Sequence, residues 1–303
     1  MNRPMSETIL SLQHLTKHYG RIHAVNDLSL EVNKGEVYGI LGPNGSGKTT
    51  TLGMILDVVN PTSGTYSWFG QPPSHTHRKR IGSILEQPIF YPYLTPLQNL
   101  KIVSLIKEVP ASNAEELLKM VGLYERRHSK FSTFSYGMRQ RMALAASLLC
   151  NPEVLILDEP TNGLDPQGIA EVRELIRTVA ARGVTIILAS HLLDEVQKTC
   201  SSVCVLDKGK RLFAGNVEEV LRETILVEVA AADPAKLEQA LAGSPLIKSV
   251  ERQHDVLLIK LEENVTAGDL NAALHAQGIV LSHLVQRKKT LENYFLELLK
   301  TAE

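Results

Sequence analysis

The sequence predicts an α/β fold in which a mixed sheet with buried central strands forms the core. Three apolar runs support this prediction, at 37–41, 154–157 and 184–189. Each has the length of a strand, and none shows the regular alternation of apolar and polar residues, which is typical of parallel strands covered on both faces. A glycine-rich loop follows the first run and leads into a helical segment at 50–56. At 303 residues, the chain has the length of about two ordinary domains.

Two further lobes are expected around this core. Residues 9–37 alternate apolar and polar side chains, with a turn sequence at 32–36, and so predict an antiparallel lobe beside the core sheet. Between 95 and 149 the apolar residues recur at helical spacing instead. We therefore expect a helical lobe there.

The loop at 42–49 has the composition of a phosphate-binding P-loop. Its glycines let successive backbone N–H groups point inward around a phosphate, and the following helix N-terminus adds partial positive charge. Lys48 can reach the terminal phosphates, and the Thr49 hydroxyl can ligate the accompanying Mg²⁺. A glycine turn with a surface lysine is the alternative, and the flanking strand and helix disfavour it. The residues predicted to bind a nucleoside triphosphate are Gly42, Pro43, Asn44, Gly45, Ser46, Gly47, Lys48, Thr49 and Thr50.

Two carboxylates follow the strand at 154–157. Asp158 and Glu159 lie at its C-terminal end, which is where open α/β sheets bind ligands. A buried carboxylate needs a cation, and Mg²⁺ on the P-loop phosphates would supply one for Asp158. Glu159 can then align or deprotonate the attacking water. The pair could instead cap a helix, but Pro160 directly after it favours a loop.

A second anion site is predicted at the start of a helix after Ser135. Ser135 is a good N-cap, and the alanine- and leucine-rich run at 142–149 favours a helix. A helix N-terminus with a serine hydroxyl and the flexible Gly137 can bind an anion. This site lies far along the chain from the P-loop.

The bulk properties restrict the class of protein. A net charge of -1 argues against a general nucleic-acid binder. The three cysteines lack metal-ligand spacing and are interpreted as core thiols. Residues 1–10 are polar, and no apolar run approaches the ~20 residues that span a bilayer. We expect a reduced, cytoplasmic protein, for which another polypeptide would supply any membrane span.

Together these segments resemble the ATP-binding-cassette (ABC) ATPases. The usual family signature is Leu-Ser-Gly-Gly-Gln, and this chain matches it at Ser135 and Gly137. It carries Tyr136 in place of a glycine, and Phe134 and Met138 also depart from the pattern. A substituted signature followed by an Arg-Gln-Arg run is similar to that of the bacterial drug- and peptide-export branch.

The resemblance implies roles for four further residues. Tyr19 would stack on adenine, and Gln87 would meet Mg²⁺ or the lytic water. His191, after the strand at 184–189, would be the switch histidine that contacts the γ-phosphate. Asp165, in the D-loop at 161–166, would sit at a dimer seam. The implied catalytic residues are Glu159, His191, Gln87 and Lys48, and the implied metal ligands are Thr49, Gln87 and Asp158.

The resemblance also implies partners. In a head-to-tail homodimer, the signature of one subunit closes over the ATP of the other. The aromatic loop at 88–94 would receive a helix of a separate integral membrane subunit, placing the protein on the inner face of the cell membrane, where ATP hydrolysis would power export. A soluble ABC ATPase acting on ribosomes or nucleic acid is the alternative. One cassette and no basic patch disfavour it, so no nucleic-acid partner is expected.

Residues 223–303 predict a second, smaller domain after an ATP-binding domain at 1–222. Strand and helix patterns follow one another in the order β-α-β-β-α-β, which is the ferredoxin-like plan. A helix is expected at 291–300. This region has no catalytic cluster, and we interpret it as a dimerisation or regulatory appendage.

Overall fold

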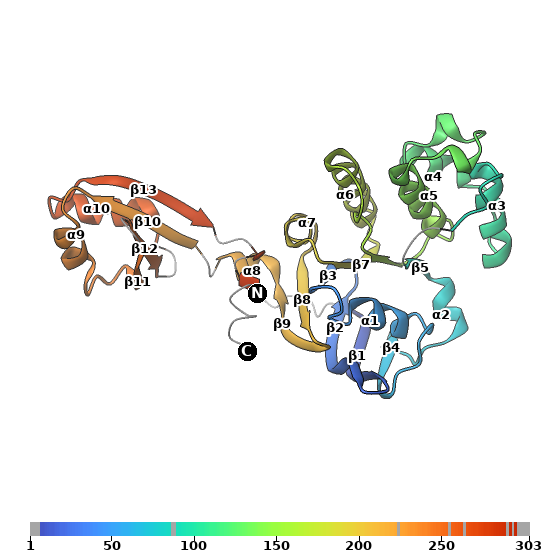
Figure 1. The fold of residues 1–303 in the computed structure, drawn as a ribbon, viewed down its shortest axis with the longest axis horizontal. Coiled ribbons are helices and arrows are strands. Elements are labelled where there is room, and N and C mark those ends of the chain that lie inside the picture. The colour runs from blue at the N-terminus through green and yellow to red at the C-terminus, as the bar shows by residue number, and fades with distance from the viewer. Residues whose placement is uncertain are drawn as a thin grey trace. The chain divides into compact units, whose positions relative to one another are not determined.

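The computed structural model describes residues 7–85, 89–222, 225–253, 256–262, 265–288, 291–292 and 294–295. The chain divides into two compact units between Asn216 and Val217. Figure 1 shows the elements of both units. No helix in these described ranges is long and apolar enough to cross a membrane.

The core of the first unit is a six-stranded sheet with the order β5-β6-β7-β3-β8-β9. Only β9 runs antiparallel to its neighbour. Every residue of β3, β6 and β7 is buried, as the three apolar runs predicted. The strands are β3 (Val37–Leu41), β5 (Ile81–Ile84), β6 (Val154–Asp158), β7 (Thr185–Ser190), β8 (Ser202–Asp207) and β9 (Lys210–Asn216).

The register of this sheet brings three loops to one edge. Leu41 of β3 pairs with Ser190 of β7, and Asp158 of β6 pairs with Ala189 of β7. The strands are parallel, so the segments that follow them all emerge at the same carboxyl edge. The P-loop, Glu159 and His191 therefore start within one or two residues of each other across the sheet.

Helices cover both faces of this sheet. Figure 1 shows α1 and the antiparallel lobe on one side and α6 and α7 on the other. The predicted helix after the P-loop is α1, and the predicted helix after the D-loop is α6. The ranges are α1 (Lys48–Ile55), α2 (His75–Lys79), α6 (Pro166–Ala180) and α7 (Leu193–Thr199).

The antiparallel lobe has three strands in the order β2-β1-β4. Its first two, β1 (Thr8–Tyr19) and β2 (Ile22–Asn33), agree with the predicted alternation. The edge strand β4 (Ser63–Trp68) was not predicted, because only Tyr66 and Trp68 of its six residues are buried. Trp68 is 1% exposed and its indole donates to the carbonyl of Ile55, 2.8 Å away. This bond ties the lobe to the end of α1.

The helical lobe contains α3 (Pro96–Lys107), α4 (Ala114–Met120) and α5 (Tyr136–Leu148), with 3₁₀ turns at Tyr124–Arg126 and Phe131–Thr133. Thr95 and Gln98 form a reciprocal capping box at the start of α3. Ser135 caps α5 by accepting a hydrogen bond from the backbone of Met138 at 3.3 Å. The predicted helix start at Ser135 is confirmed.

The second unit follows the predicted β-α-β-β-α-β order. Its antiparallel sheet has the order β11-β12-β10-β13. Apolar residues of α9 and α10 pack with those of β10 and β12 in one core, including Leu237, Leu270, Val227 and Ile259. Most of the helix expected at 291–300 lies outside the described residues. The ranges are α8 (Val217–Arg222), β10 (Ile225–Ala231), α9 (Pro234–Leu241), β11 (Ile247–Gln253), β12 (Val256–Leu261), α10 (Ala267–Ala276) and β13 (Leu281–Lys288).

Candidate nucleotide-binding site

The P-loop joins β3 to α1 and requires glycine at two positions. Gly47, the N-cap of α1, has a φ of 104°, and a Cβ there would lie 2.4 Å from the carbonyl oxygen of Ala24. A Cβ on Gly42 would lie 2.4 Å from the hydroxyl of Ser46 and 2.3 Å from the carbonyl of Leu206. Glycine at these two positions therefore lets the loop backbone pack closely against neighbouring segments. Ser46 Oγ is buried there without a hydrogen-bond partner among the described residues, which fits a site for phosphate oxygens.

Lys48 places its ammonium inside this loop. The side chain is 6% exposed, and Nζ donates to the carbonyls of Gly42 at 2.9 Å and Pro43 at 3.2 Å. Nζ also lies 3.4 Å from Oε1 of Glu159. A phosphate that enters the loop can replace these acceptors of Lys48. The new hydrogen bonds would be stronger, because the ammonium and the phosphate are both charged.

Asp158 lies against Thr49, as the predicted magnesium site requires. The Thr49 hydroxyl donates to Oδ2 of Asp158 at 2.8 Å, and Asp158 is 5% exposed. A hydroxyl and a carboxylate are the oxygen ligands that Mg²⁺ takes beside nucleotide phosphates. In the described ranges no three His, Cys, Asp or Glu side chains gather to hold a metal by themselves. The residues present thus fit a cation that binds together with phosphate oxygens.

Glu159 and His191 form a hydrogen-bonded pair at the same edge. Nδ1 of His191 lies 2.8 Å from Oε2 of Glu159, and the backbone N–H of His191 lies 3.4 Å from the same oxygen. An ionised carboxylate only accepts, so Nδ1 carries the proton in this contact. The prediction that Asp158, Glu159 and His191 meet at one sheet edge is confirmed by this geometry.

Two predicted site residues are less constrained by the structure. Tyr19 ends β1, is 48% exposed and has Nζ of Lys17 5.0 Å from its ring centre. Its exposed face leaves room for a stacked base, and the adenine contact stays a prediction. Gln87 lies outside the described residues, so its place near Mg²⁺ or water also stays a prediction.

The signature residues lie at the N-terminus of α5, on the helical lobe. The Tyr136 hydroxyl accepts a hydrogen bond of 3.0 Å from Nε2 of Gln140. Gln140 is one turn further along the helix, so this bond ties the Tyr136 side chain to the second turn of α5. None of the hydrogen bonds or ion pairs among the described residues joins Ser135 or Gly137 to the P-loop of the same chain. Ser135 and Gly137 are therefore not part of the P-loop site of their own chain, and their role as a second anion site stays a prediction.

Asp165 has a local role that the sequence did not suggest. It is the N-cap of α6, and its Oδ1 accepts a hydrogen bond of 2.9 Å from the backbone of Gly168. It is also exposed, which leaves it accessible to a second subunit. Its position at a dimer seam stays a prediction.

An exposed aromatic surface lies between β5 and α3. It consists of Ile89, Tyr91 and Tyr93, which are 93%, 49% and 65% exposed. Asn99 of α3 is buried, accepts a hydrogen bond from the backbone of Tyr91 and donates one to its carbonyl. Sequence reasoning missed this role of Asn99, since an asparagine inside a helix carries no local signal of a loop contact.

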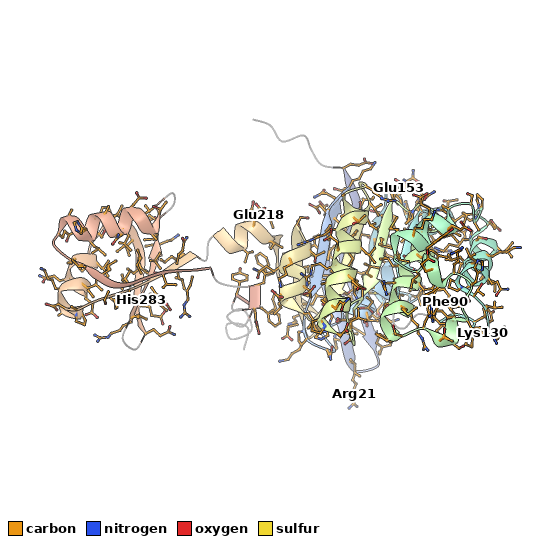
Figure 2. All side chains as sticks on the ribbon, turned by 90° about the horizontal axis from the view of Figure 1, so that it is seen from above. Arg21, Phe90, Lys130, Glu153, Glu218 and His283 are labelled. Atoms are coloured by element: carbon orange, nitrogen blue, oxygen red, sulfur yellow. The ribbon has the colours of Figure 1, made fainter. Side chains whose placement is uncertain are left out.

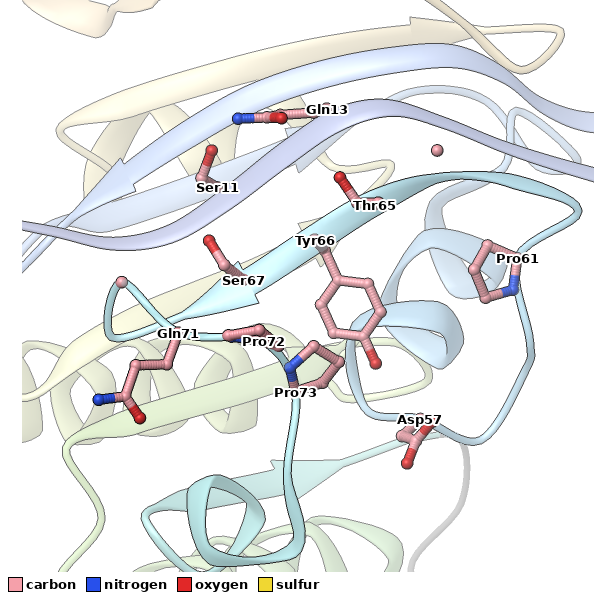
Figure 3. A pocket seen from close by; sticks show the side chains of 12 residues that line it. Ser11, Gln13, Asp57, Pro61, Thr65, Tyr66, Ser67, Gln71, Pro72 and Pro73 are labelled. Carbon is pink, nitrogen blue, oxygen red and sulfur yellow. The ribbon is translucent and has the colours of Figure 1, made fainter.

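A hollow of about 550 Å³ lies along β4, away from all the predicted site residues. Figure 3 shows Tyr66, Asp57 and three prolines beside it. Burial, followed by the charge of Asp57, raises the pKa of Tyr66. Nothing in its lining matches the chemistry of the P-loop edge.

Comparison with known proteins places this geometry in a family. The ABC transporter family matches residues 25–162. The bacitracin transport ATP-binding protein BcrA of Enterococcus faecalis is 34% identical over 299 residues, which are 97% of each chain.

Two solved structures share the fold. The structure of cbiO1 from Clostridium perfringens, described as part of an ABC transporter complex, has a TM-score of 0.65 and 30% identity over 72% of this chain and 92% of that one. The cassette MJ0796, solved as a dimer bound to ADP and Pi, has a TM-score of 0.61 and 27% identity over 69% of this chain and 99% of that one.

These findings confirm the predicted ABC cassette fold, ATP binding and ATP hydrolysis. Transport work by a cassette of this kind implies a membrane partner. The chain belongs to the ABC transporter family and is an ATP-binding subunit that hydrolyses ATP to power transport.

Proposed function

We propose that two copies of this protein close head to tail around two Mg-ATP molecules and power export through a separate integral membrane subunit. The protein would lie in the cytoplasm, bound to the inner face of the cell membrane, and would need no nucleic acid. One observation carries the proposal: Lys48, Asp158, Glu159 and His191 converge on the carboxyl edge where the P-loop begins.

Thr49 and Asp158 are the described residues that would hold Mg²⁺, and Gln87 is a further predicted ligand. When bound, Mg²⁺ neutralises charge on the phosphates and on the transferring phosphoryl group. The hydrogen bond between Thr49 and Asp158 keeps both oxygens together before the cation arrives. These two side chains therefore need little reorganisation to bind it.

Lys48 and Glu159 exchange partners as ATP binds. Without phosphate, the ammonium of Lys48 lies 3.4 Å from one carboxylate oxygen of Glu159 and stabilises its charge. When Lys48 turns to the phosphates, that oxygen becomes available to a water molecule. The other oxygen stays hydrogen-bonded to His191, which orients the carboxylate. Glu159 then acts as the base that aligns or deprotonates the attacking water.

The signature supplies the second half of each ATP site. The N-terminus of α5, with the Ser135 hydroxyl that caps it, suits an anion. A γ-phosphate held by Lys48 in one subunit and by Ser135 and Gly137 in the other would favour the closed dimer. Its loss on hydrolysis would reopen the dimer.

The aromatic surface suits a docking site for the membrane subunit. Exposed aromatic and aliphatic side chains on a braced loop are typical of contact surfaces. Phe90 packs edge-on against Phe131, with ring centres 5.1 Å apart, and Figure 2 labels Phe90 close to Lys130. Lys130, next to Phe131 in the chain, is exposed, and no ion pair among the described residues involves it. This charge favours a docking helix that carries acidic residues.

The name of a full-length relative suggests the class of transported substrate. BcrA of Enterococcus faecalis is named for bacitracin transport, and its alignment includes the second unit of this chain. We therefore propose a peptide antibiotic or similar amphipathic peptide as the cargo. The substituted signature, similar to that of the export branch, supports export as the direction.

Affinity purification of the tagged chain from detergent-solubilised membranes tests this function. We expect an integral membrane protein in stoichiometric amount, and we expect Tyr93→Glu to abolish its recovery without changing ATP binding. Glu251→Gln, an exposed change in the second unit, is the matched control. Recovery of ribosomes or DNA in place of a membrane protein would overturn the proposal.

A further inference from the structure

We infer that Tyr136 is a positioning residue that fixes the D-loop of its own subunit to the start of α5. It would thereby hold the signature and the backbone of Glu159 in one geometry during closure. The contact itself is independent of the proposed dimer, but its effect on turnover rests on the proposed function.

The phenol ring covers a glycine of the D-loop. A Cβ added to Gly163 would lie 3.3, 3.8 and 3.9 Å from Cε1, Cζ and Cδ1 of Tyr136. Gly163 has a φ of 76°, in the left-handed region that favours glycine. The absence of a side chain at 163 lets the ring approach the backbone. With the usual signature glycine at 136, this turn would be uncovered.

A buried amide fixes the direction of the ring. Nε2 of Gln140 donates to the Tyr136 hydroxyl at 3.0 Å, and Gln140 is 5% exposed. Its side chain borders a small hollow together with Leu157 and Pro160, which flank Asp158 and Glu159 in the chain. The hydroxyl is thus anchored to the region between α5 and the end of β6.

A second contact and a short backbone path extend this link to the catalytic carboxylate. A Cβ on Gly137 would lie 3.5 Å from Cδ2 of Leu164, so the signature and the D-loop lie close together at the adjacent position as well. Within the D-loop, the backbone N–H of Asn162 donates to the carbonyl of Glu159 at 3.1 Å. Gly163 is only four residues from Glu159 and follows Asn162 directly, so a displacement of Gly163 would also move the backbone of Glu159.

Hydrogen exchange of the full chain, read on peptides that cover the D-loop, tests the contact directly. We expect Tyr136→Ala to speed D-loop exchange by about 3- to 10-fold, as the loss of an aromatic contact allows. Tyr136→Phe, which keeps the ring but loses the bond to Gln140, should fall between wild type and Tyr136→Ala. Tyr93→Ala removes another exposed aromatic residue and should leave the D-loop unchanged. Unchanged D-loop exchange in a folded Tyr136→Ala variant would overturn the inference, and Tyr136→Leu replaces that variant if it does not fold.

Steady-state kinetics test the consequence for turnover. The ATP affinity of Tyr136→Ala should stay near that of the wild type, because the P-loop is intact. Its kcat should fall about 10-fold or more, because Glu159 would be misplaced. Equal values of kcat would contradict the positioning role. Failure of Glu159→Gln to dimerise with ATP would instead contradict the proposed dimer and leave the exchange result standing.

Discussion

Glu159 adopts a left-handed backbone conformation with a φ of 47°. Such a conformation costs a non-glycine residue about 1–3 kcal/mol and persists only when surrounding contacts enforce it. Here the backbone N–H donates to Ala189 at 2.9 Å and the carbonyl accepts from Asn162 at 3.1 Å. This conformation turns the carboxylate toward Lys48 and His191, away from the direction that an extended strand would give it. The strain therefore coincides with the chemistry proposed for this residue.

Replacement of Glu159 by Gln tests its role as the base. The amide keeps the shape but loses the basic oxygen, so we expect ATP binding to persist and hydrolysis to slow by roughly 10²–10⁴. Phosphate release and a nucleotide titration measure the two effects. Glu174→Gln, on the exposed face of α6, should leave both unchanged. Unchanged hydrolysis would exclude Glu159 as the base.

Replacement of Lys48 by Ala tests its phosphate contact. A hydrogen bond to a charged group contributes about 1.5–3 kcal/mol, so ATP affinity should fall about 10- to 150-fold. A titration with a fluorescent ATP analogue measures this loss. The exposed Lys34, which pairs with Glu7, supplies the control Lys34→Ala. Wild-type affinity of Lys48→Ala would contradict the assignment.

Burial makes two of the three cysteines unreactive. It raises the pKa of the Cys200 thiol far above its ordinary value and that of Cys204 to about 12, although Arg211 acts in the opposite sense on Cys204. Cys150 is only half-buried. We expect a thiol reagent at pH 8 to label one of the three cysteines in the folded protein and all three in guanidinium.

The raised pKa values of Cys200 and Cys204 predict that the folded protein becomes less stable at high pH. The folded protein favours the protonated thiols, so their contribution is complete below the ordinary thiol pKa of 9.0. It is lost as the pH rises from there toward 12, because only the unfolded chain then releases the protons. The guanidinium midpoint should accordingly fall between pH 9 and 11. Labelling of Cys204 in the folded state at pH 8 would contradict this account.

Among the elements, the edge strand β4 supports the P-loop helix α1 through a contact at its C-terminal end. Trp68 is the only tryptophan in the chain, and its bond to the carbonyl of Ile55 satisfies a group at the end of α1 that has no partner in the helix itself. The helix is thus fixed at both ends, by Gly47 at the start and by Trp68 at the finish.

Replacement of Trp68 by Phe tests this tie. The ring is largely kept but the carbonyl of Ile55 loses its donor, so we expect the free energy of unfolding to fall by about 1–3 kcal/mol. Chemical unfolding followed by circular dichroism measures the change. Val58→Ala alters an exposed residue on the nearby loop and should change stability by less than about 0.5 kcal/mol. An unchanged free energy of unfolding in Trp68→Phe would show that this hydrogen bond makes no net contribution to stability.

At the scale of the whole molecule, each unit has its own apolar core. The first contains a cluster that joins the antiparallel lobe, α1 and the central strands, and the second contains the cluster of α9, α10 and their sheet. All described residues proposed to bind ATP lie in the first unit. The boundary at 222 and the dimerisation or regulatory role of the second unit remain proposals.

Truncation after Arg222 tests this separation. We expect the shortened chain to fold and to bind ATP with an affinity within about tenfold of the full chain, which corresponds to 1.4 kcal/mol. Thermal unfolding and nucleotide titration measure the two properties. An unfolded product, or a larger loss of affinity, would show that the second unit completes the first.

Local sequence patterns were enough to predict the P-loop, the buried strands, the signature helix start and the ferredoxin-like order of the second unit. These features depend on local rules of spacing, glycine content and capping, which can be read in a window of about ten residues. Asp158 and Glu159 were recognisable for the same reason, since they directly follow an apolar strand.

The contacts between residues distant in the sequence became known from the three-dimensional fold. The register of β3, β6 and β7 brings Lys48 to Glu159 and His191 to the same carboxylate, and the packing of α5 brings Tyr136 over Gly163. It also adds β4, whose sequence is too polar to indicate a strand. Such contacts depend on pairing between segments far apart in the chain, such as Glu159 and His191, which are 32 residues apart, or on the close approach of a ring to a bare backbone. No local pattern encodes either.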